Sequence, residues 1–181
     1  AGRFPEVVAP WVPEPILDVE PPTNSLIRDP EIRQASRSVV KVVGRAPSCN
    51  RIIEGTGFVV GEERIVTNAH VVAGGRETQV QLHDGSDRDA TVVAYDPGRD
   101  LAVLHVPGLG LPALPMRDAD VGDRGGVFGF PGGGPLEISP FQVSEEMEPE
   151  GSDIYDRHRF QRQVLVLASD LNPGDSGGAL V

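Results

Sequence analysis

The sequence predicts an all-β protein made of two β units, and three observations carry this prediction. Short runs rich in Val and Ile recur along the chain, and turns rich in Gly, Asp and Pro separate them. A connector rich in Pro and Gly, residues 107–115, divides these runs into two groups. No helical pattern alternates with the runs, which excludes an architecture built on a parallel sheet. Short strands at this spacing indicate a sandwich or a barrel.

The amino-terminal part is predicted to be a lead followed by one short helix. Residues 1–28 contain six prolines, which fix φ and lack the N–H that a strand donates, so we expect an extended segment. Its apolar side chains predict that it lies against the folded body. Asp29 is the predicted N-cap of the helix, with Pro30 at the first helical position, and the helix continues to about Arg37.

The predicted strands share a high content of Val, Ile and Leu and are bounded by turn residues. In the first unit, residues 38–108, they are 39–43, 52–60, 64–67, 78–82, 90–95 and 101–106. In the second unit, residues 109–181, they are 125–130, 136–145 and 160–168. The acidic stretch between the last two strands, which ends at Asp153, is predicted to be a solvated loop.

Charge and composition exclude several classes of function. The formal net charge is −11, which argues against general binding to nucleic acid or to anionic membranes. The longest apolar run, residues 164–168, is far shorter than the roughly 18 residues of a membrane span. Cys49 is the single cysteine, so it is either a free thiol or half of a bridge whose partner lies outside this chain.

The strongest chemical signal is the segment from Asn172 to Val181, which reads NPGDSGGALV. A serine between glycines on a tight turn exposes its hydroxyl and lets other groups approach the backbone closely. The N–H groups of Gly174 and Ser176 can point into one pocket and stabilise the oxyanion of an acyl-transfer intermediate. Because Pro173 has no N–H and Gly174 is flexible, we expect that a flip of the peptide between them would empty this pocket.

A serine needs a base to become a nucleophile, and His70 is the candidate. His70 follows a β run directly, in the sequence TNAHVV, and is predicted to lie in a turn. Asp100 precedes the apolar run LAVL and is the candidate that orients the imidazole and stabilises its protonated form. The order His70, Asp100, Ser176 is that of the two-barrel serine proteases, and differs from the order in subtilisins and α/β-hydrolases.

Four blocks together resemble the trypsin-like/HtrA-like serine peptidases. They read GTGFVV at residues 55–60, IVTNAHVV at 65–72, DLAVL at 100–104 and NPGDSGGAL at 172–180. The resemblance implies two perpendicular six-stranded β-barrels of chymotrypsin type, with the triad at their seam. It also implies hydrolysis of protein or peptide substrates through an acyl-enzyme, without a metal or an organic cofactor.

Within this family, the sequence is most similar to the membrane-anchored periplasmic serine proteases of the MarP type, found in mycobacteria and related actinobacteria. Cys49 and the Pro-rich lead carry this finer likeness. It implies an extracytoplasmic location, an anchor amino-terminal to this chain, a disulfide between Cys49 and a cysteine beyond Val181, and a role in acid stress. A histidine base acts only while it is neutral, so activity is expected to fall in acid.

Two further expectations come from departures from the family pattern. The chain ends five residues after Ser176, so we expect an incomplete second barrel. No Ile-Val-Gly-Gly site precedes the first barrel, so activation by a new amino terminus beside Asp175 is not expected. An HtrA-type quality-control protease that continues into a PDZ domain, and an inactive fragment of a protease fold, are the alternatives.

The other candidate sites are weaker. Asp170 stands where trypsin-like enzymes place the base of the specificity pocket, and is either that base or a solvated loop residue. The aspartates at 84, 87 and 89 lack the spacing of an EF-hand and predict a hairpin turn. No pair of histidines has metal-ligand spacing on one element, and the glycines at 132–134 precede a strand, which argues against a phosphate cradle.

Overall fold

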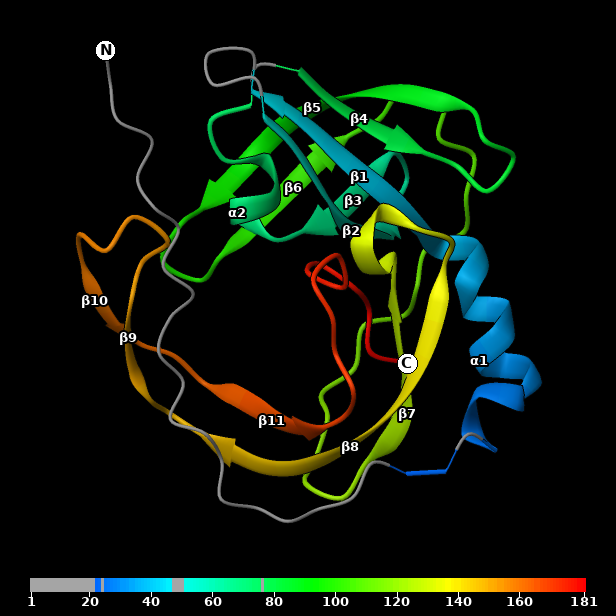
Figure 1. Cartoon of the computed structure of the whole chain (residues 1–181), viewed down its shortest axis with the longest axis vertical. Coiled ribbons are helices and arrows are strands. Elements are labelled where there is room, and N and C mark those ends of the chain that lie inside the picture. Colours follow the sequence, from blue (N-terminus) through cyan, green and yellow to red (C-terminus); the bar gives the residue numbers. More distant parts are fainter. Residues whose placement is uncertain (1–21, 24, 47–50, 76) are drawn as a thin grey trace.

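The computed structural model describes residues 22–23, 25–46, 51–75 and 77–181. Cys49 and most of the predicted Pro-rich lead lie outside these residues. The described part is built almost entirely from antiparallel strands, with little helix, which confirms the predicted all-β class (Figure 1).

The first unit is a closed six-stranded barrel. Its strands are β1 (Val39–Ala46), β2 (Arg51–Gly61), β3 (Arg64–Thr67), β4 (Glu77–Gln81), β5 (Asp87–Asp96) and β6 (Leu101–His105). They close in the order β1-β2-β3-β6-β5-β4, with every neighbouring pair antiparallel. The interior is filled mainly by Val and Leu side chains, including Val42, Val59 and Leu104, which are fully buried.

A short helix closes one side of the molecule, as the sequence predicts. Helix α1 (Pro30–Ala35) begins after Asp29, whose side chain accepts a hydrogen bond from the Glu31 N–H at 2.8 Å. The 3-10 turns η1 (Leu26–Arg28) and η2 (Ser36–Ser38) flank it. Ala35 joins a second apolar cluster with Phe128 and Phe130, so the helix packs on the strands of the second unit.

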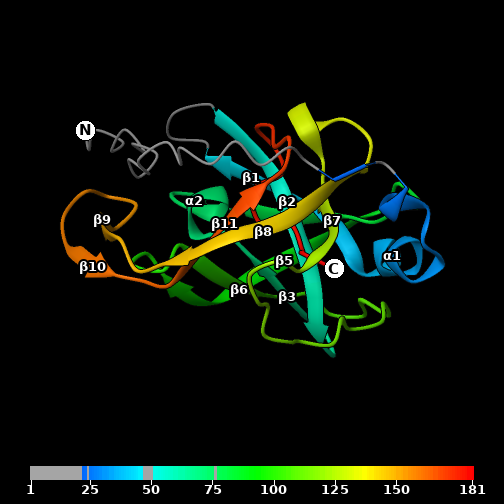
Figure 2. The same ribbon diagram turned by 90° about the horizontal axis from the view of Figure 1, so that it is seen from below.

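The second unit is open in this chain. Strands β7 (Arg124–Gly129), β8 (Glu137–Met147) and β11 (Val164–Ala168) form one sheet in the order β11-β8-β7. Near the end of the chain Leu180 forms an antiparallel bridge with Val127 of β7. A separate hairpin joins β9 (Glu150–Ser152) to β10 (Arg159–Gln161) and projects from the far end of β8 (Figures 1 and 2).

The structure corrects two predictions in this unit. The single strand predicted at 160–168 is two strands, because β10 pairs with β9 whereas β11 pairs with β8, and the chain changes partner at Arg162 and Gln163. The acidic stretch is not a solvated loop throughout. Residues 150–152 form β9, and the Asp153 side chain is only 5% exposed.

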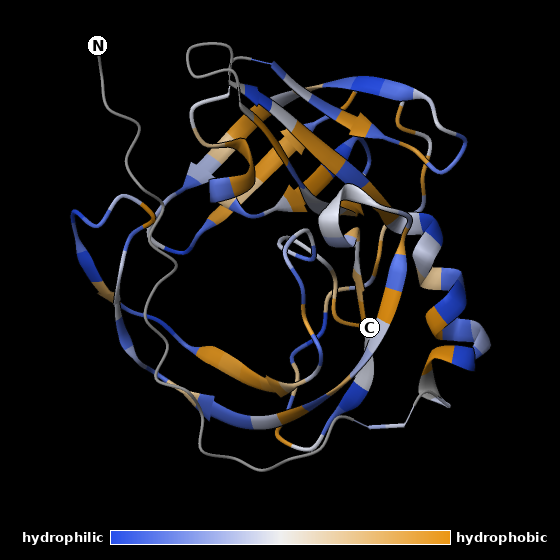
Figure 3. Cartoon of the chain, viewed as in Figure 1, coloured by the Kyte–Doolittle hydropathy of each residue, from blue (hydrophilic) through white to orange (hydrophobic). Residues whose placement is uncertain are grey.

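Apolar residues gather on the strands of the first barrel and on β11, whereas the β9–β10 hairpin is largely polar (Figure 3). Among the described residues, no helix has both the length and the apolar character that crossing a membrane would require. The turn η3 (Pro131–Gly133) and the segment at 172–178, called the serine loop below, lie between the first barrel and strands β7 and β8 (Figures 1 and 2).

Candidate active site

His70 and Asp100 meet at the open end of the first barrel. His70 lies on α2 (Ala69–Val72), a single helical turn that begins directly after β3, so the predicted turn is a helix. Asp100 lies between β5 and β6 and has a φ of +56°, a conformation that a residue with a side chain seldom adopts. The Asn68 amide and the Ala69 N–H both donate to the Asp100 carbonyl, at 2.7 and 3.1 Å. These bonds hold the Asp100 backbone against the start of α2.

The Asp100 carboxylate holds His70 at two points. One oxygen accepts a hydrogen bond from the His70 backbone N–H at 2.9 Å, and the other lies 2.7 Å from the His70 Nδ1. The two side chains are 27% and 22% exposed, so the pair is partly shielded from water. A carboxylate accepts a hydrogen bond from a protonated Nδ1, which leaves Nε2 with its lone pair free to act as a base.

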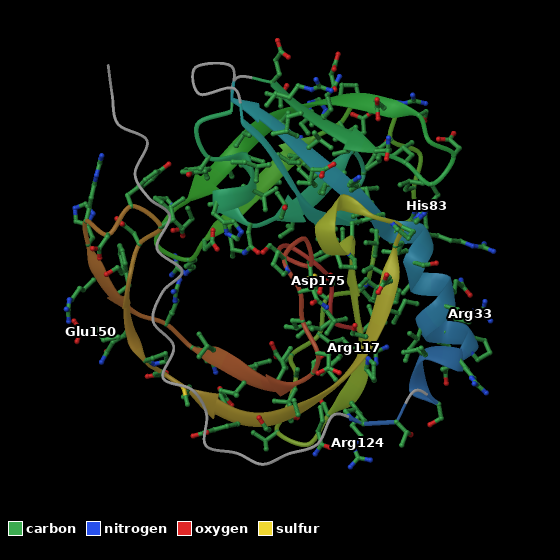
Figure 4. All side chains as sticks on the ribbon, viewed as in Figure 1. Arg33, His83, Arg117, Arg124, Glu150 and Asp175 are labelled. Atoms are coloured by element: carbon green, nitrogen blue, oxygen red, sulfur yellow. The ribbon has the colours of Figure 1, made fainter. Side chains whose placement is uncertain are left out.

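The serine loop is held in a compact shape by Asp175. Its carboxylate accepts from the Asn172 N–H at 2.8 Å, its own N–H donates to the Asn172 carbonyl at 3.1 Å, and its carbonyl accepts from the Gly178 N–H at 2.8 Å. Gly129 of β7 leaves room for it, because a Cβ there would lie 2.1 Å from Asp175 Oδ1. Figure 4 labels Asp175 in the red loop, at the centre of the molecule.

Thr56 of β2 attaches the serine loop to the first barrel. Its N–H donates to the Ser176 carbonyl at 2.8 Å, and its hydroxyl donates to the Gly174 carbonyl at 2.8 Å. The same hydroxyl accepts from the Phe130 N–H at 3.1 Å. Gly177 has a φ of +84° and approaches so closely that a Cβ would lie 2.1 Å from the Thr56 carbonyl. Thr56 is fully buried, so these polar groups depend on one another for hydrogen bonds.

Three backbone N–H groups of the serine loop have no hydrogen-bond acceptor among the described residues, and they belong to Gly174, Ser176 and Gly177. The Pro173 carbonyl accepts from the Gly132 N–H at 2.7 Å. In a trans peptide the C=O and the following N–H point in opposite directions, so the Gly174 N–H points away from Gly132. Free N–H groups of this kind can bind an oxyanion.

Ser176 and His70 lie on neighbouring segments at the seam. A Cβ added at Gly55 would lie 2.7 Å from a methyl group of Val71 and 3.1 Å from the Ser176 carbonyl, so both segments contact the same glycine. Within the described ranges, no hydrogen bond joins the Ser176 hydroxyl to His70. Hydrogen bonds between catalytic groups are often long in free enzymes and shorten when substrate binds.

The β9–β10 hairpin of the second unit packs against the segments that carry His70 and Asp100. Ile154 forms an apolar cluster with Ala69 and Ala73, on either end of α2. Its N–H donates to the Pro97 carbonyl at 3.1 Å. Arg162 donates to the Gly98 carbonyl at 3.1 Å. The hairpin therefore contacts both sides of the His70–Asp100 pair.

Asp153 organises the turn of this hairpin. Its carboxylate accepts from the N–H groups of Tyr155 and Arg157, each at 2.9 Å, and lies 3.0 Å from His158 Nδ1. The hydrogen bond from the Arg157 N–H, with those from His158 and Tyr155, holds the pKa of Asp153 below its ordinary value although burial opposes this. The predicted solvated acid is therefore the centre of a closed turn.

Tyr95 makes a further contact across the seam. Its hydroxyl lies 2.5 Å from that of Tyr155, which joins β5 to the hairpin. Burial raises the pKa of Tyr95, with smaller contributions from Tyr155 and the negative charge of Asp100. Tyr95 thus remains neutral and can share its proton with Tyr155.

Sequence reasoning named His70, Asp100 and Ser176 but gave no role to Thr56 or to the hairpin. A signal for Thr56 existed, because it is a polar residue between two glycines directly before the apolar run at 58–60. Asp170 is exposed beyond the end of β11, and its role in specificity stays a prediction. In the described part of the chain, no three His, Cys, Asp or Glu side chains form a group that could hold a metal ion.

The chain is similar to known serine proteases. A family model described as "Trypsin-like peptidase domain" matches residues 55–181. Serine protease Rv3671c of Mycobacterium tuberculosis is 39% identical over 181 residues, which cover 98% of this chain and 45% of that protein. A probable periplasmic serine endoprotease, DegP-like, of Chlamydia pneumoniae is 34% identical over 139 residues, covering 75% of this chain and 28% of that protein.

Solved structures agree with these matches. The crystal structure of the Rv3671c protease in its active form superimposes with a TM-score of 0.87 at 39% identity and covers 97% of this chain and 78% of that one. The crystal structure of its inactive form gives a TM-score of 0.77 at 38% identity and covers 90% of this chain and 79% of that one. The chain spans less than half the length of the curated relatives that it matches.

Proposed function

We propose that this chain, which belongs to the trypsin-like peptidase family of serine proteases, is the catalytic part of an endopeptidase that cleaves proteins through an acyl-enzyme. The observation that carries the proposal is the Asp100 carboxylate, which binds both the backbone N–H and the Nδ1 of His70. This arrangement fixes the imidazole with Nε2 free, as a general base requires.

The proposed reaction assigns one role to each group. Ser176 attacks the scissile carbonyl while His70 takes its proton, and a bond forms between the Ser176 oxygen and the carbonyl carbon. The N–H groups of Gly174 and Ser176 donate to the resulting oxyanion. The scissile C–N bond then breaks as His70 gives the proton to the leaving amine, and the acyl-enzyme remains. Water, activated by His70, attacks the acyl carbon, and the bond to the Ser176 oxygen breaks as that oxygen regains its proton. Asp100 stays ionised and stabilises the protonated imidazole throughout.

The geometry supports an oxyanion site that is able to bind the oxyanion. The two N–H groups are free, and the Pro173 carbonyl is turned away from them towards Gly132. The flipped peptide that the sequence predicts for an inactive state is therefore not the arrangement here. The higher TM-score with the active form of the Rv3671c protease agrees with this, although the shares covered differ.

We further propose that the protease acts outside the cytoplasm, tethered to a membrane by a segment beyond this chain. A relative named as a periplasmic serine endoprotease supports the location. The tether rests on the resemblance of the sequence to the membrane-anchored proteases of the MarP type, and a protease that continues into a PDZ domain is the alternative.

The test is Ser176→Ala in the full-length protein. Without the nucleophile, kcat for cleavage of labelled casein should fall by about 10⁶-fold, the loss seen when a catalytic serine is removed. A fluorophosphonate probe should label the wild-type protein at Ser176 and leave the variant unlabelled. Ser144→Ala in β8, which removes a hydroxyl remote from the seam, is the matched control and should behave as wild type. Equal activity of wild type and Ser176→Ala would rule out the mechanism.

A further inference from the structure

Lys41 of β1 occupies an unusual position for a lysine. It is the only lysine among the 181 residues, and its side chain is 12% exposed. The ammonium group forms an ion pair with Glu54 of β2, with 3.1 Å between Nζ and Oε1. It also donates a hydrogen bond to the Gly133 carbonyl in η3. A nearly buried ammonium group lowers the stability of the folded state unless it is paired, so loss of either contact would be unfavourable.

Both members of the Lys41–Glu54 ion pair, which belong to the first barrel, contact η3. A Cβ added at Gly133 would lie 2.1 Å from Glu54 Oε2, so the turn packs directly on the carboxylate. Two of the three residues of this turn are glycines, Gly132 and Gly133, which have φ values of +59° and +70°. Glycine segments have large conformational freedom in solution, so this turn depends on outside contacts for its shape.

Turn η3 in turn holds the serine loop. The Gly132 N–H donates to the Pro173 carbonyl at 2.7 Å, and this bond directs the Gly174 N–H to the opposite side. A continuous set of contacts thus runs from Lys41 through the η3 backbone to the peptide that carries one N–H of the oxyanion site. The yellow turn lies beside the red serine loop in both views (Figures 1 and 2).

We propose that Lys41 is a positioning residue for the oxyanion site: its ammonium group, with Glu54, holds η3 so that Gly132 keeps the Pro173–Gly174 peptide in the orientation that directs the Gly174 N–H to substrate. This inference rests on the proposed peptidase function. The polar partners of the Lys41 ammonium group among the described residues are Glu54 and Gly133, neither of which belongs to the candidate triad, so we expect Lys41 to act on the rate through this peptide. A compact ammonium group suits the task, because it can donate to a carboxylate and to a backbone carbonyl at once.

The test is Lys41→Met in the full-length protein, which keeps an unbranched side chain one atom shorter and removes the charge and the donors. With η3 released, the Pro173–Gly174 peptide samples both orientations. We expect kcat for a fluorogenic peptide to fall at least about tenfold, towards the 10²–10³-fold cost of losing one oxyanion donor, with KM unchanged. The rate of fluorophosphonate labelling at Ser176 should fall in parallel. Lys41→Arg should recover most of kcat, because it retains the charge and the donors.

Two other variants keep the test decisive. Val42→Ala, the neighbouring residue of β1, destabilises the barrel core without touching η3, and should lower the melting temperature while leaving kcat per active site near the wild-type value. Glu54→Gln, at a side chain that is 38% exposed, should fold even if Lys41→Met does not, and should lower kcat in the same sense but less.

The possible outcomes separate the inference from the proposed function. If Lys41→Met and Glu54→Gln keep the wild-type kcat, or lose activity only as far as Val42→Ala does, Lys41 has no positioning role and the inference is wrong while the peptidase assignment stands. If the wild-type protein itself fails to react with the probe and to cleave casein, the proposed function is wrong and the inference falls with it.

Discussion

At the scale of single residues, the seam depends on backbone groups held by a few side chains. Asp100 adopts a positive φ because its carbonyl and its carboxylate are both bound by the segment from Asn68 to His70. Such a conformation costs of the order of 1–3 kcal/mol and persists only where the surroundings compensate. The orientation of the His70 imidazole therefore depends on the backbone conformation of Asp100 as well as on its carboxylate.

Thr56 shows the same principle for the serine loop. One hydroxyl accepts from the Phe130 N–H and donates to the Gly174 carbonyl, so it joins the second unit to the loop through a residue of the first barrel. No apolar side chain can replace it, because both backbone groups would lose their partner.

Thr56→Val tests this role. The substitution preserves the shape of the side chain and leaves two polar groups unpaired, so the free energy of unfolding should fall by about 1–3 kcal/mol. The kcat should fall as well, by up to about 10²–10³-fold, because the Gly174 carbonyl is no longer held. Urea denaturation and steady-state kinetics on the full-length protein measure the two effects. Thr78→Val in β4, the same replacement at a buried site away from the serine loop, is the control and should keep kcat.

At the scale of elements, the β9–β10 hairpin is a polar element held by one buried carboxylate. Two N–H groups and a histidine satisfy Asp153, and Ile154 beside it packs on α2. The stability of the hairpin turn is therefore linked to ionisation of Asp153, and the turn contacts the helix that carries His70.

The pH dependence follows from the lowered pKa of Asp153. A depressed folded-state pKa contributes stability above the unfolded value, about 3.9 for Asp, and this stability is lost as pH falls through the folded value. Asp153→Asn should therefore lower the melting temperature of the full-length protein at neutral pH, and the difference from wild type should shrink once the pH falls below about 4.

The matched control is Asp156→Asn, which makes the same change of charge at an exposed position of the same turn. It should leave the melting temperature close to wild type over the whole pH range. A constant difference between wild type and Asp153→Asn from neutral pH to pH 3 would contradict the role given to the ionised carboxylate.

At the scale of the whole molecule, the two units are joined at several separate places around the seam. The serine loop is bound to Thr56, η3 is bound to Lys41, and the hairpin is bound to the turn between β5 and β6. Helix α1 adds an apolar contact on the outer side. The arrangement couples the relative position of the units to the shape of the site.

The hydroxyl pair of Tyr95 and Tyr155 offers a direct measurement of one of these contacts. A double-mutant cycle with Tyr95→Phe and Tyr155→Phe, followed by urea denaturation, should give a coupling of about 0.5–1 kcal/mol, at the lower end for a hydrogen bond because the pair is partly exposed. Two substitutions on the outer side of β6, Val103→Ala and His105→Ala, should each give no comparable coupling to Tyr155→Phe. A zero coupling for the tyrosines would mean that this contact does not join the units.

Much of the fold and the identity of the candidate site could be predicted because their signals are local. The Val- and Ile-rich runs predicted the strands of the first barrel, and the Asp29–Pro30 pair predicted the start of α1. The segments around His70, Asp100 and Ser176 named the candidate triad and the family. Neighbouring residues decide turn chemistry and strand propensity, so a single sequence carries this information.

The tertiary structure alone decided the contacts between residues far apart in the chain. The Thr56 hydroxyl meets a carbonyl 118 residues away, and the Lys41 ammonium meets one 92 residues away. The burial of Asp153 and the division of 160–168 between two sheets likewise depend on which partner lies opposite. The physical reason is that a hydrogen bond to a backbone carbonyl needs no particular residue at the other end, so it leaves no pattern in the sequence.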